Sequence, residues 1–204
     1  MKKLSVALLT LLSSSAVLAS DTNESEVNPI SYALTIGYTA GGDTLGTLEY
    51  EDNSDESIKA GAGIVIGAGL NYTINQNFDV RANGAYHFDS ANADNGDVSF
   101  NRLSFEVIPY YKLNEYVKLG VGYGVDTSVE LDSDFSDDVT FDNAGKLIFS
   151  GMYTFEDISA SLELRYSSVE YTVSKVGSIN VPDNIAKNNQ VDGNHFGLLF
   201  HWNF

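Results

Sequence analysis

The 204-residue chain carries 28 Asp and Glu residues against 11 Lys and Arg residues, which gives a net charge of −17 at neutral pH. A surface this acidic repels a phosphate backbone, so we exclude nucleic-acid binding. The chain contains no cysteine and can therefore hold neither a disulfide framework nor a lipoprotein anchor. Twelve tyrosines, eleven phenylalanines and eighteen glycines against three prolines favour strands and turns over helices.

The N-terminus has the composition of a secretory signal peptide. Two lysines precede an apolar run over residues 4–12, and the small residues that follow suit cleavage after Ala19. The run is too short to span a bilayer, which favours a removable signal over an anchor that stays in place. We therefore predict a signal peptide over residues 1–19, a polar periplasmic tail over residues 20–29 and a folded domain over residues 30–204.

Downstream of the tail, apolar residues recur at every second position, which is the period of a β-strand with one apolar face. The alternation appears in segments of about ten residues, the length of a transmembrane strand. In chain order they are ISYALTIGYT, GIVIGAGLNY, FDVRANGAYHF, RLSFEVIPYY, YVKLGVGYGV, KLIFSGMYTF, ISASLELRYS and NHFGLLFHWNF. After the signal, no segment keeps a helical period and none is apolar for long enough to form a transmembrane helix.

Two kinds of connection alternate between these eight segments. They are short turns at residues 73–77, 112–115 and 155–157, and long polar loops at residues 40–59, 89–99, 126–143 and 172–193. The outer parts of the loops, such as TLGTLEY, are candidates to continue the strands. This organisation predicts an all-β fold, an eight-stranded antiparallel up-and-down transmembrane β-barrel.

A soluble eight-stranded barrel of lipocalin type has the same period and is the alternative. The face opposite the apolar one consists mainly of Gly, Ala, Ser and Thr, which suits the interior of a narrow barrel better than a solvent-facing surface. Aromatic residues also gather near both ends of the strands, as they do at the two interfaces of a bilayer. Those near the turns are Tyr72, Phe78, Tyr111, Tyr153, Phe155, Trp202 and Phe204, and those near the loops are Tyr38, Tyr86, Phe88, Tyr123, Tyr166 and Phe196.

The N-terminal signal, the eight alternating segments and the ending FGLLFHWNF together resemble the small outer-membrane barrels of the OmpA/OmpX type of Gram-negative bacteria. The resemblance implies a location in the bacterial outer membrane. It also implies that the terminal aromatic strand, with Phe200, Trp202 and Phe204, is the signal read by the barrel-assembly machinery. OmpA itself continues into a peptidoglycan-binding domain where this sequence stops, so a wall-anchoring role is not expected.

Strand parity places a set of charged residues in the barrel interior, which we name the lumen charge network. Its predicted members are Arg81, Arg102, Glu106, Lys118, Lys146, Glu163 and Arg165. One interpretation is a structural plug in which buried charges are paired because unpaired ones are costly. The other is a gated ion path or a proton relay, for which glycines on the second and fifth strands would leave space. We favour the plug.

The sequence offers weak candidates for metal binding and catalysis. Asp132, Asp134, Asp137 and Asp138 are spaced somewhat like a calcium loop, but the segment lacks the glycine turn and the closing glutamate of an EF-hand. We interpret it as a solvated acidic loop, and no cofactor is predicted. The His87–Ser90 segment holds the one candidate pair for a nucleophile and its base, and we interpret His87 as a hydrogen-bonded lumen residue.

Together these features predict a monomeric, non-enzymatic outer-membrane barrel that serves membrane integrity or surface interaction through four acidic extracellular loops. The expected partners are outer-membrane lipid, lipopolysaccharide, the barrel-assembly machinery and a ligand of the loops. Two alternatives from other classes stay open. One is transport, through a narrow pore or a lateral gate for small molecules, and the other is lipid A modification.

Overall fold

The structure is a computed structural model, and it describes residues 29–49, 55–93 and 96–204. The predicted signal peptide and all but the last residue of the predicted tail lie outside the described residues. Strands account for 75% of the structure, which confirms the all-β prediction. Among the described residues, no helix is long and apolar enough to cross a membrane.

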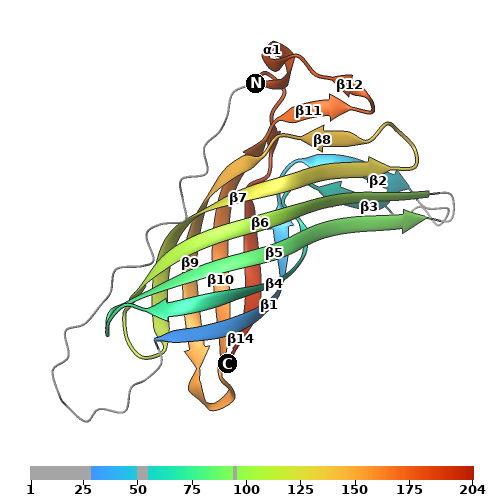
Figure 1. The fold of residues 1–204 in the computed structure, drawn as a ribbon. Coiled ribbons are helices and arrows are strands. Elements are labelled where there is room, and N and C mark those ends of the chain that lie inside the picture. Colours follow the sequence, from blue (N-terminus) through green and yellow to red (C-terminus); the bar gives the residue numbers. More distant parts are fainter. Residues whose placement is uncertain (1–28, 50–54, 94–95) are drawn as a thin grey trace, which may run out of the picture.

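Eight antiparallel strands form a closed barrel, as predicted (Figure 1). They are β1 (Ile30–Gly41), β4 (Gly63–Thr73), β5 (Phe78–Ala93), β6 (Gly96–Lys112), β7 (Val117–Ser133), β9 (Ala144–Phe155), β10 (Ala160–Tyr171) and β14 (His195–Asn203). Each strand pairs with the next in this order, and β14 closes the barrel on β1, where Leu34 faces Trp202.

The alternation of the sequence becomes an alternation of environment around the barrel wall. On β1, Ile36 is 57% exposed, whereas its neighbour Thr35 is 3% exposed and faces the interior. Apolar side chains therefore cover the outside of the barrel, whereas the inside holds most of the buried polar and charged side chains beside two small apolar clusters. A soluble barrel has the reverse arrangement, so the lipocalin alternative is wrong.

Both predicted aromatic belts lie on the outer surface of the barrel. Near the short turns, Tyr72, Tyr111 and Trp202 are exposed, and near the other end so are Tyr38, Tyr123 and Phe196. The wall between the belts carries aliphatic side chains such as Leu164 and Leu198, both more than half exposed. An apolar band between two aromatic belts matches the hydrocarbon layer and interfaces of a membrane.

The short turns are fixed by local hydrogen bonds, and they define what we call the turn end of the barrel. The Oδ1 atom of Asn75 accepts from the backbone N–H groups of Asn77 and Phe78, and Asn114 repeats this pattern with Tyr116 and Val117. Such Asx turns explain the asparagine in each of these two turns. The third turn is the 3-10 helix η1 (Glu156–Ile158).

At the opposite end, which we call the loop end, the predicted loops are largely strand. β5, β6 and β7 extend past the barrel rim into the segments 89–99 and 126–143 (Figure 1). TLGTLEY does contribute a strand, because β2 (Thr44–Glu49) pairs with β3 (Asp55–Lys59). The remaining elements are β8 (Val139–Phe141), β11 (Val173–Val176), β12 (Ile179–Asn180), α1 (Asp183–Ala186) and β13 (Val191–Asp192).

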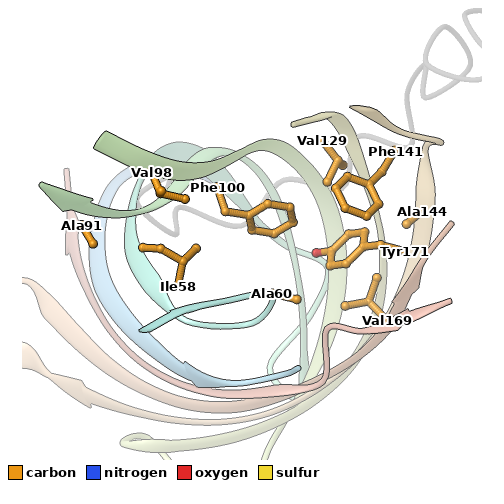
Figure 2. Packing of buried hydrophobic residues seen from close by; sticks show 10 residues of the cluster. All are labelled: Ile58, Ala60, Ala91, Val98, Phe100, Val129, Phe141, Ala144, Val169 and Tyr171. Atoms are coloured by element: carbon orange, nitrogen blue, oxygen red, sulfur yellow. The ribbon is translucent and has the colours of Figure 1, made fainter. Parts of the chain in front are cut away.

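These extensions share an apolar core of their own, the cap cluster, which was not predicted. It consists of Ile58, Ala60, Ala91, Val98, Phe100, Val129, Phe141, Ala144, Val169 and Tyr171 (Figure 2). The rings of Phe100, Phe141 and Tyr171 pack at centroid distances of 5.7 to 6.1 Å. The interpretation of these segments as solvated loops is therefore wrong in part, since they hold an apolar cluster at the loop end of the barrel.

Candidate functional site

The barrel interior holds a continuous chain of ion pairs, which begins in its turn-end half at Glu163. This carboxylate is fully buried and accepts two hydrogen bonds from Arg165, at 2.8 Å from Nε and 2.9 Å from the second guanidinium nitrogen. Its other contacts are His201 Nε2 at 2.7 Å and the Tyr110 hydroxyl at 3.3 Å. Both oxygens of Glu163 are therefore saturated, as a buried carboxylate requires.

Arg165 and Lys146 share the second carboxylate of the chain. The third nitrogen of the Arg165 guanidinium lies 2.8 Å from Glu106 Oε2, and Lys146 Nζ lies 2.8 Å from Glu106 Oε1. Lys146 Nζ also donates to Ser104 Oγ at 2.9 Å. Because Arg165 contacts Glu163 and Glu106 at once, it connects β10 to β6 across the lumen.

Asp126 continues the chain, although the sequence placed it in a loop. It is fully buried, with Lys146 Nζ 2.8 Å from its Oδ1 atom and the Ser104 hydroxyl donating to the same oxygen at 2.6 Å. Its Oδ2 atom accepts a hydrogen bond from Tyr171 at 2.8 Å. Asp126 was missed because it opens an aspartate-rich stretch, but its position in phase with the inward residues Gly122 and Gly124 was a usable signal.

Arg102 lies at the loop end of the interior and is held mainly by aromatic and imidazole groups. Its guanidinium lies 5.0 Å from the centre of the Phe100 ring and 5.8 Å from that of Tyr171. It donates to His87 Nε2 at 3.0 Å, while Asp126 Oδ2 is 4.0 Å from its Nε. This cation therefore links the charged chain to the cap cluster.

The remaining charged residues lie at the mouth of the turn end. Asp79 is clamped between Lys112 and Lys118, each at 2.8 Å. Arg81 is 3% exposed and hydrogen-bonds to Asn71 Oδ1 at 2.6 Å and weakly to Asn203 Oδ1 at 3.5 Å. Within the part of the chain that the structure describes, Arg81 enters no ion pair.

The seven residues of the predicted network thus divide into three groups. The structure joins Glu163, Arg165, Glu106 and Lys146 directly, and adds Asp126 and Arg102 at their loop-end side. We name this set of six residues the charge column. Lys118 belongs instead to the clamp on Asp79, and Arg81 stands apart from both groups. The column holds three acids and three bases, so its formal charges cancel.

Glycines on β7 make room for the large side chains of the interior. A Cβ atom at Gly120 would lie 2.7 Å from the Tyr110 ring, and one at Gly122 would lie 2.6 Å from Ile108. A Cβ atom at Gly124 would meet Lys146 at 2.9 Å. The space left by these glycines is therefore occupied by side chains, which supports the plug over an open path.

The acidic calcium candidates are dispersed among turn hydrogen bonds. Asp134 accepts from the backbone N–H of Asp97, Asp138 accepts from that of Ser133, and Asp132 accepts from the Asn101 side chain. Nowhere in the described residues do three or more His, Asp or Glu side chains gather closely enough to hold a metal ion. The four aspartates do not form one ligand set.

The candidate pair His87 and Ser90 is not brought together. His87 is 2% exposed and faces the interior, where its Nε2 atom lies 2.8 Å from Thr39 Oγ1. Ser90 follows at an odd spacing on the same strand, so its side chain points to the other face, where it is exposed. His87 therefore cannot act as the base for Ser90 as a nucleophile.

The closed wall, the apolar outer face and the two aromatic belts define the fold of an eight-stranded transmembrane β-barrel. No protein-family model and no curated protein sequence matches the chain. Among solved structures, it is similar to Ail, the attachment invasion locus protein of Yersinia pestis, in complex with the heparin analogue sucrose octasulfate. The two share 15% identity over 87% of this chain and 100% of Ail, with a TM-score of 0.50.

Neisserial surface protein A has a similar fold, at 10% identity over 87% of this chain and 98% of that one, with a TM-score of 0.50. OmpT of Vibrio cholerae matches over 52% of its own length with a TM-score of 0.28. At sequence identities this low, the similarities to Ail and to Neisserial surface protein A establish the fold of this chain but do not indicate its activity.

Proposed function

We propose that the chain is a closed, non-enzymatic, monomeric barrel that works at the cell surface through its acidic loop end, in surface interaction or membrane integrity. The observation that carries this proposal is the charge column beneath the cap cluster. Paired charges lie in the barrel interior and apolar side chains pack at its loop end, which supports a closed lumen with the exposed loop end as the working surface. The turn end then faces the periplasm.

The exposed residues of the loop end indicate what kind of partner it suits. Its exposed acids are Asp43, Asp55, Glu56, Asp97, Glu130, Asp132, Asp134, Asp137, Asp138, Asp142, Glu170, Asp183 and Asp192, against Lys59, Lys175 and Lys187 as bases. Ail binds a sulfated polyanion in its solved structure. A loop end this acidic repels such a ligand, so we expect a cationic partner or divalent ions shared with lipopolysaccharide phosphates.

Planar-bilayer recording of the refolded chain tests the closed barrel. We expect no steady conductance from the parent protein. A control in which Glu163 and Arg165 are both replaced by alanine removes the centre of the column and should conduct if it folds. Steady single-channel conductance by the parent would overturn the proposal in favour of a narrow pore.

One observation favours a second candidate, lateral transport of small apolar molecules. A hollow of about 750 Å³ lies in the wall over β4 to β7, where the outward positions are small, at Ala68, Ala82 and Gly84. The interior residues Asn83 and Glu106 line its floor. If the hollow is a lateral gate, Gly84→Leu should reduce uptake of a fluorescent hydrophobic dye by proteoliposomes, whereas a closed barrel shows no uptake above empty vesicles.

A further inference from the structure

The turn-end mouth contains a pocket of about 430 Å³. Arg81 lines the pocket together with hydroxyl side chains from three other strands, those of Ser31, Thr154 and Ser161. Phe155 and Phe204 also line the pocket, as do the acidic residues Asp79 and Glu156. The pocket is separate from the charge column, which begins further in at Glu163.

Arg81 is the least satisfied cation in this region. One of its terminal guanidinium nitrogens is buried and has no hydrogen-bond partner. Its two hydrogen bonds go to neutral amide oxygens, those of Asn71 and Asn203. A buried guanidinium without a carboxylate is costly, and most proteins pair such a group with an anion.

The neighbouring acids are already engaged or remote from the guanidinium. Both oxygens of Asp79 lie 2.8 Å from lysine ammonium groups, those of Lys112 and Lys118. Glu156 lies in the η1 turn, where it is exposed. Glu163, further in, is already bound by Arg165 and His201. Among the described residues, no carboxylate lies within ion-pair distance of Arg81.

Several other lining residues carry amide or hydroxyl groups that can donate hydrogen bonds. Asn71 Nδ2 donates to Ser31 Oγ at 3.3 Å, and Asn203 Nδ2 donates to Ser161 Oγ at 3.2 Å. The Thr154 hydroxyl lies 3.3 Å from the same Ser161 oxygen. Because their oxygens accept from the amides, the serine hydroxyls are free to turn their protons toward a bound acceptor.

We propose that this pocket binds a small oxyanion of the phosphate class, held by the Arg81 guanidinium and the surrounding hydroxyl groups. A guanidinium nitrogen without a partner suits an oxyanion, because hydrogen bonds between a cationic donor and an anionic oxygen are among the strongest in proteins. In the orientation proposed above, the ligand enters from the periplasm. The proposed phosphate site does not require a closed lumen. Ion conductance by the barrel would therefore overturn the proposed function without contradicting this site.

Calorimetric titration of inorganic phosphate into the detergent-refolded chain, at constant ionic strength in chloride, tests the site. The parent should bind one phosphate saturably, and Arg81→Gln should weaken binding at least tenfold. Lys175→Gln removes one positive charge from the exposed loop end and should leave the affinity unchanged. Equal binding by the parent and Arg81→Gln, or no binding by the parent, would overturn the proposal.

A second variant keeps the test decisive if Arg81→Gln fails to fold. Asn71→Asp places a carboxylate next to Arg81 Nε, where Asn71 Oδ1 now lies at 2.6 Å. This internal anion should displace phosphate and raise the urea midpoint of the phosphate-free protein. Full phosphate affinity in Asn71→Asp would contradict the assignment.

Discussion

Tyr171 donates a hydrogen bond of 2.8 Å to Asp126 Oδ2, and this contact joins the two interior layers of the molecule. The Tyr171 ring packs with Phe100 and Phe141 in the cap cluster, while Asp126 belongs to the charge column. The phenol is the only neutral donor on this oxygen among the described contacts, with Arg102 4.0 Å away. This hydrogen bond is therefore a direct link between the cap cluster and the charge column.

The first prediction concerns this contact. Tyr171→Phe keeps the ring in the cap cluster but removes the donor to a buried carboxylate, so we expect a loss of about 1.5–3 kcal/mol in the free energy of unfolding. Urea unfolding in detergent micelles measures it. Tyr38→Phe changes a lipid-facing tyrosine that is 59% exposed and should leave the midpoint unchanged. Equal midpoints for Tyr171→Phe and the parent would show that the cap and column are independent.

The second prediction tests coupling within the column. Glu106→Gln leaves both Lys146 and Arg165 without one of their carboxylate contacts, and breaking a buried pair typically costs about 3–5 kcal/mol. The exposed Glu130 provides the matched control, and Glu130→Gln should change stability by less than about 0.5 kcal/mol.

Adding Lys146→Met to Glu106→Gln removes both members of one pair. If the two residues interact directly, the double variant should lose less stability than the two single variants lose together. Strictly additive losses in urea unfolding would contradict the pairing.

The inward residues were predictable because strand parity leaves little freedom. Arg81 and Glu163 lie on the polar face of strands whose other face is apolar and points to the lipid. Their side chains must therefore point into the barrel interior. Which of them meet was not predictable, because contact across the lumen depends on the stagger of the strands, and parity does not determine stagger. Arg81 was therefore grouped with Glu163, although the structure gives it amide partners at the mouth.

The cap cluster escaped prediction for a different reason. Its residues come from short strands and strand extensions in which single apolar residues alternate with acidic ones, as at Val129 and Leu131 beside Glu130 and Asp132. Each segment alone has the composition of a solvated loop. The cluster forms because segments far apart in the sequence come together at the loop end (Figure 2). The pattern of any one segment does not predict this contact.

The third prediction concerns orientation in the membrane. The chain has no cysteine, so single-cysteine variants can be labelled without background. A membrane-impermeant maleimide added to intact cells should label Ser136→Cys at the loop end and spare Gln76→Cys in the first short turn. Both variants should label after lysis. Labelling of Gln76→Cys in intact cells would reverse the topology.

The last prediction concerns the terminal strand. Phe204 is 66% exposed on the lipid side, and its backbone N–H and carbonyl each bond Tyr32 at 2.9 Å. Phe204→Asp places a charge at an apolar interface and removes the final aromatic of the proposed assembly signal, while those backbone bonds remain available. We expect unassembled protein to accumulate in the periplasm, seen as loss of heat-modifiable migration on gels. Phe135→Asp, which adds the same charge to an exposed loop-end position, should assemble normally. Refolding of Phe204→Asp in detergent separates the two possible causes, because an assembly signal is not needed there. Failure in cells with normal refolding in detergent supports a signal, whereas normal assembly in cells would show that Phe204 contributes ordinary strand packing.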